Sequence, residues 1–408
     1  MRYRLPLYVA GAATARAGDE MSGPALLLVG IAATDSASAG SALLSGITVS
    51  AAVGGPVFGA MLDRAAAPGR LLTGALAAYS AALIAILLIL GRLPLPVVIA
   101  TAVLGGLIGP ALAGGWTSQL PRVVEPAGLP RATALDAMTY NVASLAGPVL
   151  AGAVAVIAGA RTGVVVAVAL IALALPVAWT LPEAPGASSR RRSTSVAGDL
   201  VSGFLAIVHA KFLARATITS VISYIGVGML VACSPLLGAA ALGAANAGTF
   251  LLAALAAASL TANVLVARRP EMLLPDTTVL GSTLMLAVAF LIAATVSPVP
   301  LFIAMALAGA AAGPQLTALF AVRHREAPER LRGQIFTTGA SLKITGYAIG
   351  AGIGGPIATW SLSGALVVAA GFEVLAAVSY AAVTAVGCGG AGRQPEEASA
   401  QAQLGPAP

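Results

Sequence analysis

The feature that most constrains this chain is its succession of long apolar runs, which contain almost no charge. Of the 408 residues, 58% are hydrophobic and 9% are charged, whereas soluble domains carry roughly 25% charged residues. A water-soluble protein of this length could not cover its surface with so few charges, so lipid must be its main solvent. The runs are continuous and do not alternate with period two, which favours helices over a membrane barrel.

Charges, glycines and prolines interrupt the apolar runs at intervals that suit membrane helices of about 20 residues. We predict a bundle at 1–181, a cytoplasmic linker at 182–198, a second bundle at 199–386 led by an amphipathic interfacial helix, and a disordered tail at 387–408. The predicted fold is all-α and integral to the membrane, with about twelve transmembrane helices in two pseudo-symmetric six-helix bundles. The predicted spans are 5–33, 40–61, 71–90, 97–118, 132–159, 162–181, 212–237, 241–267, 273–295, 299–322, 333–357 and 361–386.

Arginine and lysine concentrate on one side of these spans. Eighteen of the 22 lie on the side of the two chain ends, and only Arg92 and Arg161 lie opposite. Because cytoplasmic loops carry the basic excess, both termini are predicted to be cytoplasmic. The net charge of +7 then reflects topology and not binding of nucleic acid. The excess of arginine over lysine and the abundance of alanine and glycine suit a GC-rich bacterial gene, so a bacterial inner membrane is the predicted location.

The two halves resemble each other weakly. Gly109-Pro110-Ala-Leu matches Gly313-Pro314-Gln-Leu at an offset of 204 residues, in the fourth and tenth predicted spans. Two similar six-span halves in parallel orientation are one of the known transporter architectures.

A short motif lies between the second and third predicted spans. It reads Gly59-Ala-Met-Leu-Asp63-Arg64 and is followed by Gly69-Arg70. The motif resembles the Gly-x-x-x-Asp-Arg signature loop of the major facilitator superfamily, although the trailing Gly-Arg comes late and a second basic residue is missing. The resemblance implies two bundles that rock against each other, with Gly59, Asp63, Arg64 and Arg70 at a cytoplasmic gate.

Two further segments are similar to the drug-efflux and siderophore-export branch of that superfamily. Ala143-x-x-x-Gly147-Pro148-x-x-x-Gly152 in the fifth span resembles the antiporter motif, and residues 16–19 resemble the opening segment of the branch. This resemblance implies proton-driven export of a small molecule.

Asp63 has a physical role that does not depend on the resemblance. A carboxylate at the cytoplasmic mouth can lie against the N-terminus of another helix, where partial positive charge collects. In a protein of two rocking bundles, such a contact would hold the cytoplasmic side closed. The alternative is an ordinary ion pair in the loop that fixes topology.

Three charges lie in the middle of the first span. Asp19 and Glu20 follow Arg16 by three and four residues, which places both acids on the Arg16 face of the helix. Because a charge at that depth is costly unless it is paired or faces water, the three must line an interior cavity. If Arg16 neutralises one acid, the other can exchange a proton. We favour Asp19 as a proton-coupling or cationic-substrate site; a purely structural network is the alternative.

The remaining deep charges lie in three later spans. Lys343 and Glu373 occupy the last two spans and are predicted to pair with each other, with Lys343 as a lesser candidate for binding an anionic substrate. Asp136 begins the fifth span and either joins a proton relay or is an ordinary acid near a helix N-terminus. Tyr140 and Asn141 lie one turn further on and are predicted to line the pathway.

Small residues and tryptophans complete the pattern. Glycine and proline repeat along one face of two spans, which allows close helix contact. This pattern predicts a sliding seam for alternating access or simple tight packing, and the two interpretations are compatible. Tryptophans near span ends are predicted interface anchors. The small residues are Gly147, Pro148, Gly152, Gly346, Gly350 and Gly354, and the tryptophans are Trp116, Trp179 and Trp360.

We therefore predict a secondary active transporter that couples proton entry to efflux of an apolar or amphiphilic small molecule. Its predicted partners are the substrate, protons and the lipid bilayer, and the chain is predicted to be monomeric. An uptake permease for a metabolite is the alternative within the same class. A membrane enzyme acting on lipids would need clustered Asp, His or Cys, and the two histidines are far apart in the chain. No catalytic residue, metal or cofactor is predicted.

Overall fold

The computed structural model describes residues 4–183, 196–244 and 247–391. Within this part of the chain the regular structure is helical, with thirteen α-helices and several short 3-10 or π segments. Ten helical segments are long and apolar enough to cross a membrane. Helices α1 (Arg4–Thr34) and α12 (Arg332–Trp360) are equally long but more polar. The prediction of an all-α membrane fold with about twelve spans is confirmed.

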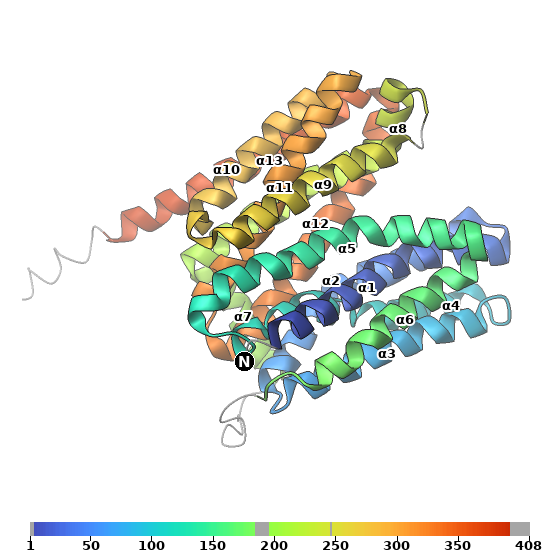
Figure 1. Cartoon of the computed structure of the whole chain (residues 1–408), viewed down its shortest axis with the longest axis horizontal. Coiled ribbons are helices and arrows are strands. Elements are labelled where there is room, and N and C mark those ends of the chain that lie inside the picture. The colour runs from blue at the N-terminus through green and yellow to red at the C-terminus, as the bar shows by residue number, and fades with distance from the viewer. Residues whose placement is uncertain (1–3, 184–195, 245–246, 392–408) are drawn as a thin grey trace, which may run out of the picture.

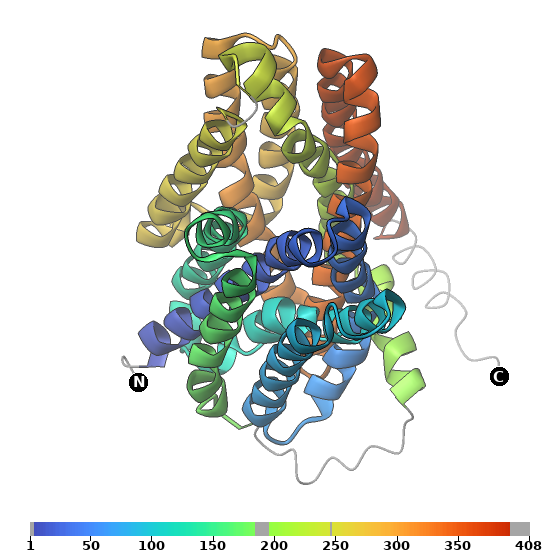
Figure 2. The same ribbon diagram turned by 90° about the vertical axis from the view of Figure 1, so that its right-hand side faces the viewer.

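The helices form two bundles that are separate in both ribbon views (Figures 1 and 2). The N-terminal bundle contains α1, α2 (Ala37–Arg64), α3 (Pro68–Ile89), α4 (Leu95–Gly106), α5 (Leu129–Ala158) and α6 (Ala160–Trp179). The C-terminal bundle contains α8 (Lys211–Leu242), α9 (Gly248–Arg268), α10 (Pro275–Ala293), α11 (Pro298–Glu326), α12 and α13 (Leu362–Ala391). Helix α7 (Val196–His209) lies between them in the chain and packs on α2, α8 and α12.

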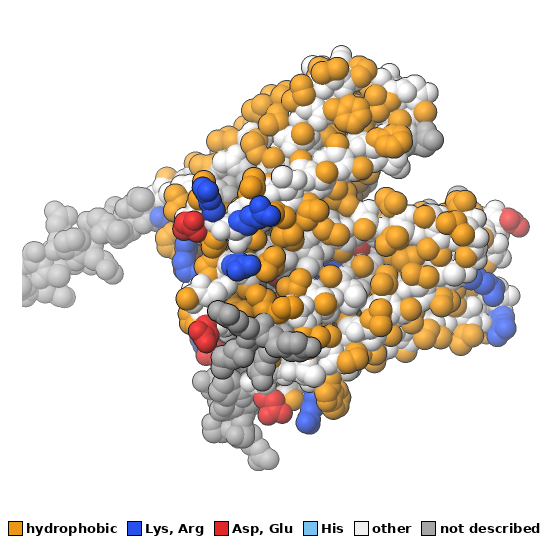
Figure 3. Space-filling model, viewed as in Figure 1, with side chains coloured by type: hydrophobic (Ala, Val, Ile, Leu, Met, Phe, Trp, Pro, Cys, Tyr) orange, Lys and Arg blue, Asp and Glu red, His pale blue; other side chains and the backbone are white. Residues whose placement is uncertain are grey.

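The bundles touch at one end of the molecule and diverge at the other. The space-filling view shows a cleft that opens at the right-hand end, between the two lobes (Figure 3). At the left-hand end α2 packs against α12, and α5 packs against α9 and α11. Helix α1 begins and α13 ends at this closed end (Figure 1).

Glycine or proline marks the position at which several helices begin or end. Gly159 joins α5 directly to α6, and Gly243 follows α8; both have positive φ angles, which glycine adopts without steric cost. Pro68, Pro275 and Pro298 begin α3, α10 and α11, where the missing N–H would have had no partner within the helix.

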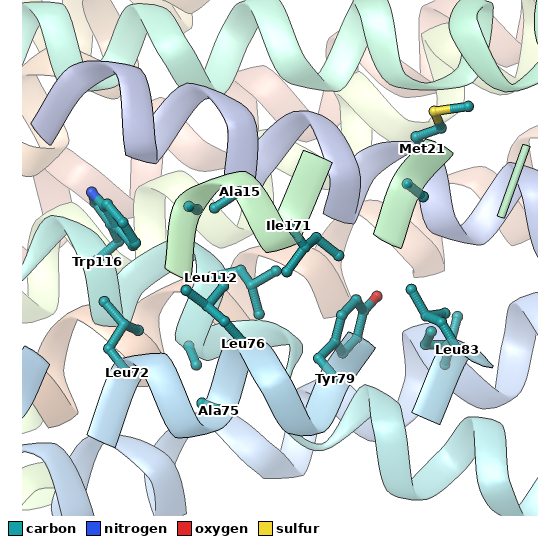
Figure 4. Packing of buried hydrophobic residues seen from close by; sticks show 14 of the residues in the cluster. Ala15, Met21, Leu72, Ala75, Leu76, Tyr79, Leu83, Leu112, Trp116 and Ile171 are labelled. Carbon is teal, nitrogen blue, oxygen red and sulfur yellow. The ribbon is translucent and has the colours of Figure 1, made fainter. Parts of the chain in front are cut away.

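Each bundle has its own apolar core, and Figure 4 shows part of the N-terminal one, including Leu76 of α3 and Trp116. Trp116 is 0% exposed and packs against the Tyr8 ring, so its predicted role as an interface anchor is wrong. The π-helical segment η1 (Ala111–Gly115) after α4 lies in the interior and leads directly to Trp116. Trp179 and Trp360 are exposed.

Three boundaries differ from the sequence predictions. Helix α4 ends at Gly106 and continues only through the π-helical segment. Helix α7 begins at Val196, inside the predicted linker, and α13 continues to Ala391, inside the tail predicted to be disordered. The remaining linker residues 184–195 and tail residues 392–408 lie outside the described residues.

Candidate functional site

The carboxylate of Asp63 joins the two bundles at the closed end. Its two oxygens accept hydrogen bonds from the backbone N–H groups of Gly333 (2.7 Å) and Gln334 (2.9 Å). These N–H groups belong to the first turn of α12, where they have no partner within the helix and carry partial positive charge. The sequence predicted this kind of contact for Asp63; its role in opening and closing stays a prediction.

Glycine allows α2 to lie directly against α12 at the same end. A Cβ atom on Gly59 would overlap the backbone of Gln334, and one on Gly55 would overlap the backbone of Thr337. Gly114 of η1 makes a third close approach to the backbone of α12. The glycine-containing face of α2 and the π-helical segment therefore close this end of the molecule by direct contact with the backbone of α12.

The two arginines of the signature-like motif lie in different surroundings. Arg64 is half-buried at the end of α2. Arg70 lies over the ring of Trp179, with its guanidinium carbon 5.4 Å from the ring centroid. Because α3 begins at Pro68, its first turn brings Arg70 to α6, and the implied role of Arg70 at the gate stays a prediction.

A basic residue that the sequence did not single out lies near Asp63. Arg122, in the connection between α4 and α5, donates to the side chain of Gln119 at 2.7 Å. Burial lowers the pKa of the Arg122 guanidinium, and the carboxylates of Asp63 and Glu329 oppose that effect. The closed end therefore combines a helix N-terminus, two carboxylates and a half-buried cation.

Arg16 is buried in an ion pair with Asp136 of α5. Nη1 of Arg16 lies 3.0 Å from Oδ1 of Asp136, and Nη2 lies 3.2 Å from Oδ2. Tyr8 donates to the same carboxylate at 3.0 Å and Thr117 donates at 2.8 Å, while Arg16 also bonds to Thr139. Both charges of the pair thus have partners within the N-terminal bundle.

The prediction that Arg16 neutralises an acid of its own helix is wrong, because α5 supplies a closer carboxylate. The side chain of Asp19 instead interacts with Tyr79 of α3, whose hydroxyl lies 2.8 Å from Oγ of Ser22. Glu20 packs with its backbone and Cβ on Gly147 of α5 and interacts electrostatically with residues of the second bundle. Neither carboxylate forms an ion pair with another described residue.

Lys343 of α12 lies between two tyrosines that come from different bundles. Its Nζ donates to Oη of Tyr224 on α8 at 2.9 Å, and it lies 4.0 Å from that ring centroid and 5.0 Å from the Tyr140 centroid on α5. The predicted ion pair of Lys343 with Glu373 is absent from the described residues, and that prediction is wrong. Glu20 is the carboxylate that acts on Lys343 electrostatically, from beyond ion-pair distance.

Glu373 lies inside the C-terminal bundle instead. It is 0% exposed, and its Oε1 accepts a hydrogen bond from Ser223 at 3.0 Å. Gln315 donates to Ser223 at 3.2 Å and to Thr283 at 3.0 Å. Oε2 of Glu373 has no hydrogen-bond partner. Helix α13 turns Glu373 towards α8, away from Lys343.

Of the two residues predicted to line the pathway, Tyr140 and Asn141, Tyr140 lies where the bundles meet. The guanidinium carbon of Arg16 and Nζ of Lys343 each lie 5.0 Å from the centroid of the Tyr140 ring. It also packs on Phe320 of α11. Nδ2 of Asn141 is buried without a hydrogen-bond partner.

Arg323 is a site residue that sequence reasoning missed. The predicted tenth span ends at residue 322, which places Arg323 in the following connection, yet the structure buries it to 1% exposure within α11. Its three-residue spacing from Phe320 was the signal that could have placed it inward. Its Nε and Nη2 have no hydrogen-bond partner. It borders a narrow gap of about 10 Å³ that is lined by Gly114, Tyr140, Phe320, Arg323, Phe336, Ala340 and Lys343.

The small-residue faces of α5 and α12 pack inside the bundles and not across them. Gly147 lies against α1, whereas Gly152 has no atom near its Cβ position. Gly346, Gly350 and Gly354 lie against α8. Pro148 is an internal residue of α5. The structure thus shows tight packing within each bundle at these residues, and the sliding seam stays a prediction.

Comparison with known proteins shows which family has this architecture. The model of the Major Facilitator Superfamily matches residues 8–275. The chain belongs to the major facilitator superfamily. An uncharacterized MFS-type transporter of Sinorhizobium fredii, y4rN, is 27% identical over 292 residues, which cover 70% of this chain and 71% of that protein.

Solved structures of other members share the fold. The human organic anion transporter MFSD10 superposes with a TM-score of 0.73 at 15% identity, covering 93% of this chain and 99% of that one. A bacterial homologue of the iron transporter ferroportin, in an outward-facing state, gives 0.72 at 16% identity and covers 94% and 99%. The proton:xylose symporter XylE gives 0.66 at 14% identity and covers 91% and 94%.

Membership of the superfamily defines the class of activity. The protein is a multi-pass membrane protein and a secondary transporter that works by alternating access, not an enzyme. Within the described chain, His, Cys, Asp and Glu form no group of three that could hold a metal ion.

Proposed function

We propose that this major facilitator exports an amphiphilic small molecule across a bacterial inner membrane, in exchange for protons. In this proposal the closed end faces the cytoplasm and the cleft faces outward. The basic residues support that orientation, because 18 of 22 were assigned to the side on which α2 ends, and cytoplasmic loops carry the basic excess. Because one chain supplies both bundles, we propose that the protein acts as a monomer.

The observation that carries the proposal is that the bundles are joined at one end and open at the other. We call the two hydrogen bonds that Asp63 accepts at the joined end the Asp63 latch. Asp63 holds the N-terminus of α12 through two hydrogen bonds, while the lobes separate at the opposite end (Figure 3). Such a conformation is one of the two that alternating access requires. The opposite conformation would break the Asp63 contacts and close the cleft.

Proton coupling is supported by the two acids of α1. Glu20 and Asp19 are half-buried deep in a membrane helix and form no ion pair with another described residue. A carboxylate in such a place is costly when charged and is a natural proton site. Glu20 acts electrostatically on Lys343, Tyr140 and Tyr224, so proton binding at Glu20 would change the charge where the two bundles meet.

Export is supported by the resemblance of the segment around Gly147 and Pro148 to the antiporter motif. The structure adds that Gly147 packs directly against Glu20. The motif therefore fixes the position of a proposed proton-binding residue. An amphiphilic cargo is supported by the lining of the interface, which combines aromatic rings with the cations Lys343 and Arg323.

The test is an accumulation and toxicity assay in a bacterium that lacks its own efflux pumps. Cells producing the protein would be compared with cells producing Glu20→Gln and Asp19→Asn at equal expression, with and without a protonophore. Asp35→Asn is the matched control, because Asp35 is exposed in the connection between α1 and α2.

We expect lower accumulation of at least one compound, and loss of that effect with Glu20→Gln or the protonophore but not with Asp35→Asn. Increased accumulation would identify an uptake permease instead. Export that survives both acidic substitutions and the protonophore would refute proton coupling through α1.

A further inference from the structure

Two cations at the bundle interface have no acidic partner among the described residues. Lys343 is 5% exposed and Arg323 is 1% exposed, and neither forms an ion pair. Lys343 makes one hydrogen bond, to the neutral Tyr224 hydroxyl. Nε and Nη2 of Arg323 make none. Buried cations are normally paired with an acid, so these two leave positive charge uncompensated.

The nearby acids do not supply the missing charge. Asp136 is already engaged by Arg16, and Glu373 is bonded to Ser223 inside the C-terminal bundle. Glu20 is the acid that interacts with Lys343, and one carboxylate cannot balance both Lys343 and Arg323. The local charge is therefore positive when Glu20 is ionised, and more positive when Glu20 is protonated.

The two cations line one narrow gap between the bundles. Its free volume is about 10 Å³, which is room for about one water molecule, and aromatic rings from both bundles form most of the remaining wall. Known ligand sites measure roughly 300–1,000 Å³. A transported molecule therefore cannot enter the gap in this conformation, and its charged end can reach the two cations only when the bundles separate here.

The packing of Arg323 is specific to its guanidinium. Gly339 of α12 lies directly against the group, and a Cβ atom at that position would overlap it. The ring of Phe336 lies on another side, with its centroid 6.0 Å from the guanidinium carbon. If Arg323 only filled space at the closed end, an apolar side chain would do the same. The charge of Arg323 and the glycine at position 339 that makes room for the guanidinium would then not be needed.

We propose that the transported molecule carries an anionic group, such as a carboxylate, which binds between Lys343 and Arg323 while its apolar body packs on the surrounding tyrosines and phenylalanines. This inference rests on the proposed function, because it assumes that the transport pathway runs between the bundles.

The test measures binding to the purified full-length protein in lipid nanodiscs, with no proton gradient. The probes are three radiolabelled naphthalene derivatives of similar shape: the carboxylate, the neutral carboxamide and the methylammonium cation. The variants are Arg323→Gln, Lys343→Gln and Gly339→Ala, and the last keeps every charge but displaces the guanidinium. Arg325→Gln is the matched control, since Arg325 lies two residues further along α11 and pairs with Asp276 at 2.9 Å.

We expect the wild-type protein to bind the carboxylate at least about tenfold more tightly than the amide, and the cation most weakly. Arg323→Gln, Lys343→Gln and Gly339→Ala should reduce this preference, whereas Arg325→Gln should keep it. Equal affinity for carboxylate and amide, or no binding of the carboxylate, overturns the proposal without any need for a variant. Because the assay uses no gradient, a clear anion preference would stand even if the cell assay showed no proton coupling.

Discussion

At the scale of single residues, the buried charges of this transporter fall into two groups. The Arg16–Asp136 pair is bidentate and receives further hydrogen bonds from Tyr8 and Thr117. Lys343 has only a tyrosine hydroxyl as a hydrogen-bond partner. A well-bonded pair fixes the packing of α1 on α5, whereas an unsatisfied charge can exchange partners during transport.

Removing one member of the Arg16–Asp136 pair should destabilise the protein. Arg16→Gln or Asp136→Asn leaves an isolated charge in the bundle, which costs roughly 3–5 kcal/mol in comparable buried pairs. The double variant carries no isolated charge and should be less destabilised than either single variant. Thermal unfolding in detergent, followed by tryptophan fluorescence, measures this order. A double variant that unfolds at the sum of the two single losses would contradict the pairing.

Glu373→Gln should have almost no effect on stability. An ionised carboxylate without a cation would be costly at this depth, so we expect Glu373 to carry a proton, and glutamine has the same shape as the protonated acid. The amide oxygen of the substituted glutamine can still accept a hydrogen bond from Ser223, and the change in unfolding free energy should stay within about 1 kcal/mol. The same thermal assay applies. A loss as large as that of Asp136→Asn would show instead that Glu373 is charged and needs that charge.

Sequence reasoning found most of these charged residues but not their partners. Offsets of three and four correctly indicated that Asp19 and Glu20 lie near Arg16 along α1, yet the nearest carboxylate came from α5. The rotation of one helix about its axis relative to another is set by packing, which no local pattern reports. The same reason explains why Lys343 and Glu373, on adjacent spans, do not meet.

At the scale of elements, the contact between α2 and α12 depends on the absence of side chains. Gly59→Ala should therefore hold the closed end apart, because its Cβ would overlap backbone atoms of Gln334 that cannot move independently. A cysteine replacing Ala340, which lines the narrow gap, should react faster with N-ethylmaleimide in this variant. The background for this measurement lacks the native Cys233 and Cys388.

Gly74→Ala provides the matched control for that measurement. Gly74 lies on α3 with no atom within 4 Å of its Cβ position, so alanine fits there and should slightly favour the helix. Labelling at position 340 should be unchanged in this control. If Gly59→Ala also leaves the rate unchanged, the α2–α12 contact does not close the cytoplasmic side.

The spans themselves were predictable because lipid imposes length and hydropathy on each helix. The early end of helix α4 could not be predicted from length and hydropathy. Gly109-Pro110 and Gly313-Pro314 match in sequence, but the first pair follows the end of α4 while the second lies inside the continuous α11. Glycines at 105, 106, 114 and 115 surround the first pair and weaken the helix there. Repeat symmetry in the sequence did not reveal this difference.

At the scale of the whole molecule, the internal packing favours motion of two rigid bundles. The glycine faces of α5 and α12 join helices within a bundle, and each bundle has a separate apolar core. The contacts between the bundles include the Asp63 hydrogen bonds, the glycines of α2, the packing of α5 on α9 and α11, and the aromatic and basic residues at the centre. Rocking can therefore break the interface while each core stays intact.

Asp63→Asn should shift this balance towards the conformation that is open at the end where Asp63 lies. Asparagine keeps one acceptor but loses the charge that strengthens both bonds, a loss of about 1–3 kcal/mol, which changes the ratio of two conformations roughly 5- to 150-fold. Pulsed electron paramagnetic resonance, which measures the distance between two spin labels, detects the change. The distance between labels at Ala66 and Glu329, near the latch, should lengthen, and that between Leu93 and Thr295, at the cleft, should shorten.

The two distances make the prediction specific to rocking. Local disorder at the latch would lengthen or broaden the Ala66–Glu329 distance and leave Leu93–Thr295 unchanged, and that result would refute a rigid-body motion. Asp35→Asn is the control, since it removes one carboxylate at the open end without touching α12. Opposite changes at the two ends in Asp63→Asn alone would show that one carboxylate on α2 sets the balance between the two conformations of the transporter.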